Sequence, residues 1–451
     1  MSMPSADLYE RLVERQNSGN PVRIGLVGAG KFGTMFLAQA RTTAGLKPTV
    51  VVDLDTSRAT SALTRVGFPS ERVVTATTPG ELADAVRRGQ VGVTDEVEVA
   101  IASGIDVLVE STGVVRAAAG HAVAAFEAGV HVVMVSVEAD VLVGVALARR
   151  AAAAGVVYTM AYGDQPALIC EMVDWARCCG FTVTAAGKGT RHLPAFHQST
   201  PETVFDHYGA EAESLKRDGV NPRMFNSFLD GTKSSIEMAA VANATGLLPS
   251  ETGLLFPAVG TDGLAEMLRP ASVGGLLDHA GTVEVVSCVE TDGSPVPNDL
   301  RWGVYVVVEA EHEYVQECFR QYGIPSDRSG RYAAAWRPNH WIGLELGPSI
   351  AAAALDGKAI GVAGSHVAEV VGCAKTDLVA GQVIDGEGGF CAWGRLTTAA
   401  SARDRSQLPL GLLEGARLVR DVPGGAVITA EDVELDADSL LVELRAETVG
   451  E

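Results

Sequence analysis

The sequence lacks regular cysteine pairing, a basic stripe and a long apolar run. Its seven cysteines form no CxxC pair, which excludes a disulfide framework and a zinc module. Lysine and arginine form no stripe in a chain of net charge −21, so we expect neither nucleic acid nor a membrane as partner. The start, MSMPSADLYERLVERQN, lacks the apolar core of a signal peptide, and the alanine-rich run near Arg149 is too short to span a bilayer. We therefore expect a cytoplasmic protein.

The composition is that of a compact α/β protein. The chain has 451 residues, of which 47% are hydrophobic and 20% charged, and it contains 50 glycines without a low-complexity tail. A chain of this length is expected to form about three domains, which leaves ample sequence for a catalytic cleft.

The most informative stretch is VRIGLVGAGKFG. Val22–Val27 has the apolar run of a buried parallel strand, and Phe32–Ala40 continues as a helix-forming segment. Between them, Gly28, Gly30 and Gly33 complete the GxGxxG pattern of dinucleotide-binding proteins. The first glycine permits a tight turn, the second lets the backbone approach a pyrophosphate, and the third lets the helix pack closely on the strand. A glycine-rich turn that binds no nucleotide is the alternative.

An acid follows the next expected strand, as the dinucleotide pattern requires. Asp53 in PTVVVDLD is placed to hold the ribose hydroxyls and to repel a 2′-phosphate, which favours NAD. Arg58 lies just downstream, where a guanidinium would pair with that phosphate and admit NADP. Lys31 and Phe32 complete the expected cofactor loop. The sequence thus predicts an NAD or NADP site.

The strand and helix pattern repeats after this first unit. Ile105–Glu110 and Val130–Val135 are expected strands, with a helix over Arg116–Ala128 between them, and together they predict a doubly wound Rossmann sheet. Ligands of such folds bind at the carboxyl edge of the sheet. Small or polar residues at strand ends are therefore further cofactor candidates: Ser111, Thr112, Gly113, Ser136 and Glu138. Their alternatives are an ordinary turn and a helix cap.

Changes in composition and in the expected pattern of strands and helices divide the chain into three expected domains. Residues 1–164 form the Rossmann domain, residues 165–348 a mixed α/β catalytic domain, and residues 349–451 a β-rich domain. At the first boundary, Asp164 and Gln165 begin a helix that also carries Glu171. These three residues are candidates for binding substrate hydroxyls, or they cap the helix.

A long polar loop from Lys188 to about Asn226 is expected to serve the active site. It holds a concentration of basic residues in an acidic chain, which would capture a phosphate or carboxylate: Lys188, Arg191 and His192. A solvated basic loop is the alternative. The loop's histidines match no compact metal motif, so no metal site is predicted, although a substrate-bridged divalent ion stays open.

Several motifs carry a family resemblance. GLVGAGKFG, DVLVESTG and AGVHVVMVS, in this order, resemble the homoserine dehydrogenase superfamily. That family's Asn-Lys pair is replaced here by Ser136-Val137-Glu138, which argues against homoserine dehydrogenase itself. AYGDQPA and SLKRDGVNPRMFNSFLDGTKSSIEMAAVANATG look closest to 1-deoxy-D-xylulose 5-phosphate reductoisomerase-like enzymes. ARLVRDVPGGAVITAEDVEL resembles a SAF domain, for which stability or oligomer contact is the simpler role.

The resemblance implies catalytic residues in FLDGTKSSIEM. Homoserine dehydrogenases place a catalytic lysine at such a helix start, which Asp230, Thr232 and Lys233 match. Lys233 would donate a proton to the carbonyl oxygen, while Asp230 and Glu171 would handle hydroxyl protons. The alternatives are a solvated lysine paired with Glu237 and a helix-capping aspartate.

The function expected from the resemblance is that of an NAD(P)-dependent oxidoreductase. Its substrate would be a small anionic polyol-like keto or aldehyde compound, and the specific version is reductoisomerisation of 1-deoxy-D-xylulose 5-phosphate. A simple sugar-acid or homoserine-like dehydrogenase without rearrangement is the first alternative. A nucleotide-sensing or scaffold protein is the second. We also expect a homo-oligomer.

Overall fold

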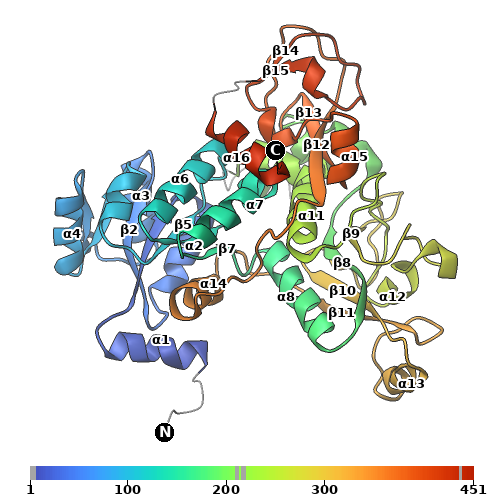
Figure 1. Ribbon diagram of the computed structural model, residues 1–451, viewed down its shortest axis with the longest axis horizontal. Coiled ribbons are helices and arrows are strands. Elements are labelled where there is room, and N and C mark those ends of the chain that lie inside the picture. The colour runs from blue at the N-terminus through green and yellow to red at the C-terminus, as the bar shows by residue number, and fades with distance from the viewer. Residues whose placement is uncertain (1–6, 209–212, 215–219, 436–438, 451) are drawn as a thin grey trace. The chain divides into compact units, whose positions relative to one another are not determined.

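The computed structural model describes residues 7–208, 213–214, 220–435 and 439–450. The chain forms two compact units (Figure 1). The first contains Met1–Ala167, Trp341–Val362 and Glu443–Glu451, and the second contains Leu168–His340 and Ala363–Val442. The division into three domains stays a prediction. The LKRDG part of the quoted family motif, residues 215–219, lies outside the described residues.

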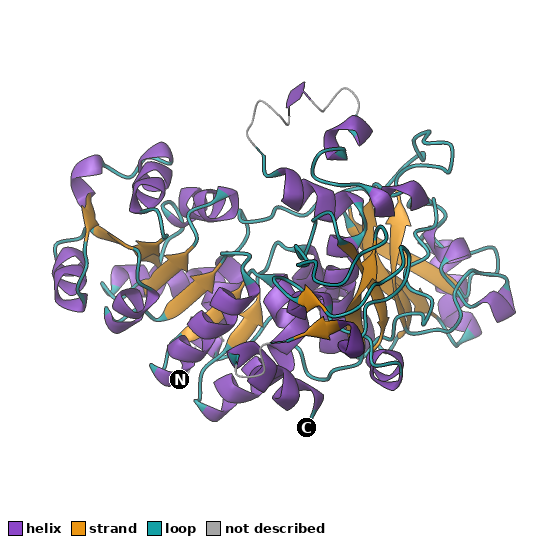
Figure 2. Ribbon diagram, turned by 90° about the horizontal axis from the view of Figure 1, so that it is seen from above, coloured by secondary structure: helices purple, strands orange, loops and turns teal. Residues whose placement is uncertain are grey.

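The first unit is built on a seven-stranded sheet in the order β3-β4-β2-β1-β5-β6-β7. All of its strand pairs are parallel. Its strands are almost continuously apolar because helices cover both faces of the sheet (Figure 2). The strands are β1 (Val22–Val27), β2 (Leu46–Val52), β3 (Val73–Thr75), β4 (Val91–Thr94), β5 (Val107–Glu110), β6 (His131–Met134) and β7 (Tyr158–Met160).

The strand order reverses at β1 and β5, which lie side by side. In parallel sheets this reversal is where ligands bind, at the carboxyl ends of the strands. The helices of the unit are α1 (Leu8–Asn17), α2 (Lys31–Ala40), α3 (Thr56–Arg65), α4 (Pro79–Arg87), α5 (Val97–Ala102), α6 (Val115–Glu127), α7 (Val137–Ala153), α14 (Gly347–Ala351) and the π-helix Ala352–Asp356. Helix α16 (Leu440–Val449) lies mostly in this unit. The predicted α/β fold with a doubly wound sheet is confirmed.

A carboxylate is buried inside this unit, on α7. Asp140 is 2% exposed, and its Oδ1 accepts a 2.8 Å hydrogen bond from the Tyr158 hydroxyl on β7. Its Oδ2 has no hydrogen-bond partner among the described residues. Burial raises the pKa of Asp140 to about 6, because the charged form loses its water.

Asp140→Asn is expected to stabilise the protein at neutral pH. The folded-state pKa lies above the ordinary value of 3.8, so the folded chain binds the proton more tightly, and the free energy of unfolding falls as pH rises from about 4 to about 6. The variant removes that loss. Its free energy of unfolding should therefore exceed that of the wild type by about 3 kcal/mol near pH 7 and by almost nothing near pH 3. Denaturant unfolding of both proteins across this pH range measures the difference. An equal difference at both ends would contradict the prediction.

The second unit contains a four-stranded sheet in the order β11-β10-β8-β9. Only the β8–β9 pair of this sheet is parallel. The strands are β8 (Thr182–Thr190), β9 (Thr282–Ser287), β10 (Val304–Glu309) and β11 (Tyr332–Arg337). The helices are α8 (Gln165–Cys178), α10 (Pro222–Leu229), α11 (Thr232–Thr245), α12 (Leu264–Met267) and α13 (Glu313–Gln321). Short 3-10 helices are Pro194–Gln198 and Val204–His207.

Helix α11 is covered on several sides. The structure buries almost every one of its residues. The reason is that α11 packs against β9 and also against two strands far along the chain, β12 (Ala368–Ala374) and β13 (Ala392–Thr398). A helix covered on several sides needs no polar stripe.

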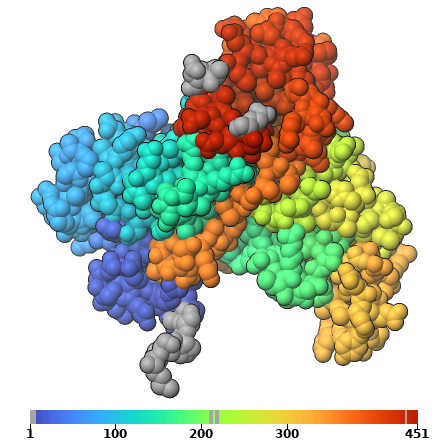
Figure 3. Space-filling view, in the orientation of Figure 1, coloured from blue at the N-terminus to red at the C-terminus, as the bar shows by residue number. Residues whose placement is uncertain are grey.

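The C-terminal part of the second unit is rich in β-structure. Strands β12 and β13 pair antiparallel, and so do β14 (Arg417–Leu418) and β15 (Val433–Glu434). Helix α15 (Ala399–Asp404) follows β13. Figure 3 draws these residues in orange and red. The predicted β-rich texture is therefore present, while the SAF resemblance stays a prediction.

Candidate active site

The glycine loop after β1 has the geometry of a phosphate cradle. Gly28 has φ +96°, and a Cβ there would lie 2.7 Å from the Ser111 carbonyl oxygen. A Cβ on Gly33 would lie 2.2 Å from the Gly28 carbonyl oxygen, so α2 packs against the turn only because this residue is glycine. Gly30 has open space where its Cβ would point. Two glycines are thus required by the fold, and the third keeps a space clear beside the start of α2, where a helix attracts anions.

The neighbouring residues of the loop take the positions that the sequence predicts. Lys31 is exposed as the first residue of α2, and Phe32 is half-buried against the hydrophobic core. Asp53 follows β2, and its Oδ2 accepts a 2.9 Å hydrogen bond from the Ala29 amide. Arg58 reaches to 3.8 Å from the same oxygen. The structure therefore brings the predicted acid and its basic neighbour to the glycine loop.

A buried carboxylate joins the candidates that follow β5 and β6. The Glu110 side chain is wholly buried at the end of β5. Its Oε1 accepts from the Thr112 amide and hydroxyl at 3.2 and 2.6 Å, and its Oε2 accepts from the Ser136 hydroxyl at 2.5 Å. The Ser136 Oγ in turn accepts from the Gly113 amide at 2.9 Å. Glu110 therefore links the residues that follow β5 to the residues that follow β6 in one hydrogen-bonded group.

The other two candidates at this edge are Ser111 and Glu138. The Ser111 hydroxyl donates to the Val27 carbonyl oxygen at 2.7 Å, so it ties β5 to the glycine loop. Glu138 is half-buried in the first turn of α7. Sequence reasoning missed Glu110, although a charged residue that ends an apolar strand is a usable signal.

The predicted helix-start residues are not gathered at one point. Asp164 and Gln165 are buried at the start of α8, where the Asp164 carboxylate accepts from the Gln165 amide at 2.9 Å. Whether these residues bind substrate hydroxyls or cap the helix stays a prediction. Glu171 lies farther along α8 and is exposed.

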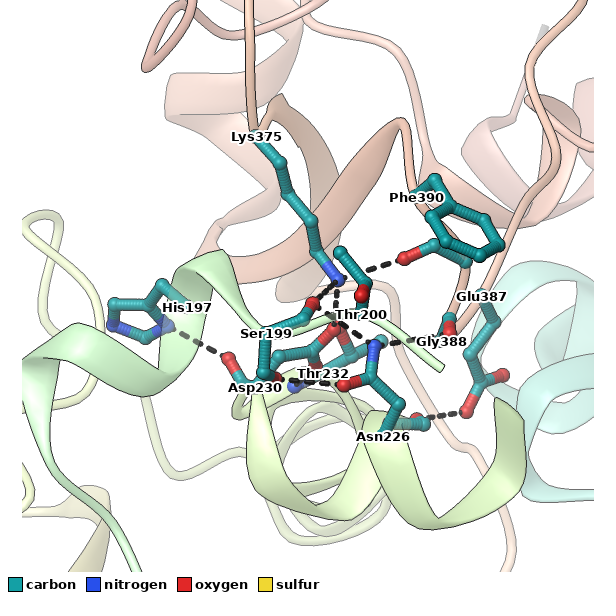
Figure 4. Close-up of polar contacts among 12 residues, drawn as sticks. His197, Ser199, Thr200, Asn226, Asp230, Thr232, Lys375, Glu387, Gly388 and Phe390 are labelled. Carbon is teal, nitrogen blue, oxygen red and sulfur yellow. Dashed lines mark hydrogen bonds and ion pairs between the residues drawn. The ribbon is translucent and has the colours of Figure 1, made fainter. Parts of the chain in front are cut away.

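The second unit has its polar centre at the corner between α10 and α11. Asp230 ends α10, and Gly231 turns the chain with φ +88°. The Asp230 carboxylate is fully buried, and its Oδ1 accepts from the Thr232 amide at 2.9 Å. Its Oδ2 lies 2.8 Å from the Lys375 ammonium (Figure 4). Lys233 is half-buried in the first turn of α11.

The three basic residues of the predicted cluster have different surroundings. The Lys188 ammonium is buried and forms an ion pair with Glu237 of α11. Burial lowers the pKa of His192 to about 3, and the charge interaction with His197 is the second cause of this shift. This imidazole is therefore neutral. Arg191 is half-buried and has no ion-pair partner in the part of the chain that the structure describes. Of these three residues, Arg191 is therefore the charged one that has no ion-pair partner among the described residues.

Four aromatic rings form a ladder beside this corner. Phe256 stacks on His192 with 3.8 Å between ring centroids, His192 lies 4.8 Å from His197, and His197 stacks on Trp393 at 3.8 Å. Phe256 has the left-handed backbone angle φ +50°, which is uncommon for a bulky residue. Sequence reasoning missed Phe256, Trp393 and Lys375, because they come from segments far apart along the chain.

A buried glutamate holds the Phe256 end of the ladder. Glu284 on β9 accepts from the Leu255 and Phe256 amides at 3.0 and 3.3 Å. Burial raises the pKa of Glu284 to about 7. Its carboxylate thereby supports the strained backbone that presents Phe256 to His192.

Comparison with known proteins identifies the class of the middle part of the chain. Residues 163–346 match the family described as oxidoreductase DRL, catalytic domain. The matched range contains the α10–α11 corner and all of the four-stranded sheet. The middle part of the chain is therefore similar to the catalytic domain of an oxidoreductase, and the chain has an α/β fold. No curated protein matches the chain.

Solved structures to which the chain is similar include two dehydrogenases and a putative oxidoreductase. Scyllo-inositol dehydrogenase from Lactobacillus casei is 14% identical with a TM-score of 0.28, over 41% of this chain and 50% of that one. The WlbA dehydrogenase from Bordetella pertussis is 17% identical with a TM-score of 0.26, over 38% and 46%. The putative oxidoreductase yvaA from Bacillus subtilis is 13% identical with a TM-score of 0.36, over 76% and 91%. The chain spans about half the length of the first two.

Two kinds of feature are absent from the described residues. Within the described ranges, no group of three or more His, Cys, Asp or Glu side chains is arranged to hold a metal ion. Among the helices that the structure describes, none has both the length and the apolarity needed to cross a bilayer.

Proposed function

We propose that the protein is an NAD(P)-dependent oxidoreductase acting on a small anionic, polyol-like keto or aldehyde substrate. The dinucleotide binds at the carboxyl edge of the seven-stranded sheet, and the substrate binds in the second unit. When bound, the nicotinamide ring supplies or accepts the hydride. The specific reaction we propose is reductoisomerisation of 1-deoxy-D-xylulose 5-phosphate, in line with the motif resemblance and the oxidoreductase match over residues 163–346.

The observation that carries the cofactor proposal is the difference among the three glycines. Gly28 and Gly33 are needed for the fold, because a Cβ on either would overlap backbone atoms. The fold does not require a glycine at position 30, because a Cβ on Gly30 would meet no atom within 4 Å. Open space beside a helix start, next to Asp53, fits a dinucleotide whose pyrophosphate lies against the backbone.

The substrate assignment depends on Arg191 and Lys233. Arg191 is half-buried and has no ion-pair partner within the described ranges, and a guanidinium is suited to hold a phosphate or carboxylate by paired hydrogen bonds. Of the other two residues that the sequence favours, Lys188 forms a buried ion pair with Glu237, and His192 is a neutral ring stacked on Phe256. Lys233 at the start of α11 is the proposed proton donor to the substrate oxygen.

Asp53→Asn is expected to change the cofactor preference. The carboxylate repels a 2′-phosphate, whereas a carboxamide keeps an acceptor for the Ala29 amide and leaves Arg58 free to bind that phosphate. The ratio of the NADPH to the NADH dissociation constant should fall by about ten-fold. Fluorescence titration measures both constants. Asp55→Asn, which retains the cap of α3, is the matched control and should leave the ratio unchanged.

Turnover tests the proposed function. We would follow NAD(P)H absorbance with 1-deoxy-D-xylulose 5-phosphate and a panel of sugar acids, using the wild type, Lys233→Ala and the exposed-site control Lys358→Ala. Turnover of the phosphorylated substrate that Lys233→Ala abolishes supports the proposal. Turnover of a sugar acid alone would favour a simple dehydrogenase, and cofactor binding without any turnover would favour a sensor.

A further inference from the structure

The strongest unassigned feature is a buried ammonium group in the second unit. Lys375 follows β12, and its side chain is 1% exposed. Its Nζ donates to the Asp230 Oδ2 at 2.8 Å, to the Ser199 carbonyl oxygen at 2.7 Å and to the Gly389 carbonyl oxygen at 2.9 Å (Figure 4). An ammonium has three donors, and all three are used. Lys375 therefore acts through its protein partners and not on a ligand.

The ion pair fixes Asp230 from two sides. One carboxylate oxygen is bound to Lys375 and the other accepts from the Thr232 amide. The backbone carbonyl of the same residue is the partner of His197, whose Nδ1 lies 2.7 Å away. Holding the side chain therefore also holds the direction of this carbonyl group.

The carbonyl in turn selects one form of the His197 ring. A carbonyl oxygen only accepts, so the Nδ1 of His197 carries the hydrogen. Burial lowers the pKa of His197, which favours the neutral ring, and in the neutral ring Nε2 keeps its lone pair. Stacking on Trp393, with an angle of 18° between the rings, fixes the plane. Nε2 has no hydrogen-bond partner in the described part of the chain. It is also not one of the fully buried polar atoms that lack a partner, so it is not sealed inside the protein. The half-buried ring thus presents a free acceptor.

We propose that Lys375 and Asp230 are positioning residues that hold His197 in its Nδ1–H form, so that its Nε2 accepts a hydrogen bond from a substrate hydroxyl. This inference rests on the proposed function, and it narrows the substrate to one with a hydroxyl group near the reacting carbon. It also gives Asp230 a new role, because a carboxylate with both oxygens bound inside the protein does not reach a substrate.

The same contacts explain why the C-terminal part belongs to the second unit. Asn226 donates to the Ser199 and Gly388 carbonyl oxygens at 3.1 and 3.0 Å, and the Gly394 amide donates to the Thr232 hydroxyl at 2.8 Å. The bonds that involve Gly388 and Gly394 join the α10–α11 corner to the segments around β13. The β-rich part thereby supplies Lys375 and Trp393 to the histidine site.

The test uses the full chain and the double variant Asp230→Asn/Lys375→Met, which removes both charges. A matched control is Asp327→Asn/Arg269→Met, which removes another buried ion pair of the same unit. Long-range proton–nitrogen correlation spectra of the histidine rings report the His197 form, assigned with His197→Gln. The rate constants kcat and KM, and the NAD(P)H dissociation constant, are measured on the same proteins.

The wild type should show His197 in the Nδ1–H form, and the double variant should show a mixture of forms. For the double variant, kcat/KM should fall by about 10-fold to 100-fold, with the cofactor dissociation constant unchanged. The control should change neither quantity. Lys375→Arg, which keeps the charge but not the three-donor geometry, replaces the double variant if the latter does not fold.

Two results would overturn the inference. One is a wild-type His197 that carries its hydrogen on Nε2, and the other is a folded double variant with the wild-type spectrum and kcat/KM. If the wild type turns over no substrate, the proposed function fails, and the spectra still decide whether the ion pair positions His197.

Discussion

Gly30→Ala is expected to fold normally and to lose most of its cofactor affinity. The new methyl group meets no atom of the protein within 4 Å, and the backbone of Gly30 lies in the ordinary extended region that alanine adopts freely. In the proposed complex the same space is filled by the pyrophosphate. The dissociation constant for NADH should therefore rise by about ten-fold or more, equivalent to about 1.4 kcal/mol. Fluorescence titration together with a thermal melt measures both effects.

Two other glycines provide the controls for this prediction. A Cβ on Gly33 would lie 2.2 Å from backbone, so Gly33→Ala should lower stability by about 1–3 kcal/mol as an overpacked core does. Gly80, near the start of α4, also has open space, and Gly80→Ala should leave stability and NADH binding unchanged or slightly improve stability. Wild-type NADH affinity in Gly30→Ala would contradict the proposed cradle.

Lys375→Met is expected to be the most destabilising single change in the second unit. It leaves the Asp230 carboxylate without its countercharge in a fully buried place, and it removes a donor from two carbonyl groups. Breaking a buried ion pair from one side costs about 3–5 kcal/mol. Denaturant unfolding of the full chain measures the loss.

Removing the Asp230 charge as well shows what causes the loss of stability in Lys375→Met. In Asp230→Asn/Lys375→Met no unpaired charge remains, so much of the stability should return, because neutral replacement of a buried pair is often nearly neutral. A double variant as unstable as Lys375→Met would show that the lost hydrogen bonds, and not the isolated carboxylate, cause the effect. Wild-type stability in the single variant would contradict the ion pair itself.

Local sequence patterns predict the first unit well. Val22–Val27 is a strand in both the prediction and the structure, and the expected helix from Phe32 begins one residue earlier, at Lys31. The glycines, Asp53 and the strand-end residues follow from the same local patterns. Apolar runs, turns and helix starts are set by neighbours in the sequence, so this part of the fold needs no long-range information.

The second unit could not be predicted in the same way. Asp230 and Lys375 are separated by 145 positions, and Phe256 and Trp393 also reach the histidines from segments far away along the chain. No local pattern marks such partners. The buried environment of α11 was missed for the same reason, because strands beyond residue 360 cover it. Burial also changes the chemistry of Lys188 and His192, which look like free cations in the sequence.

The central claim is that the chain transfers hydride between a nicotinamide cofactor and a small carbonyl substrate. The most direct measurement uses NADH or NADPH with deuterium at the transferable position, incubated with the protein and 1-deoxy-D-xylulose 5-phosphate or the sugar-acid carbonyl compounds. The account predicts a product heavier by one deuterium, formed by the wild type and not by Gly30→Ala at low cofactor concentration. A product without deuterium, or no product from any of these substrates, would contradict it.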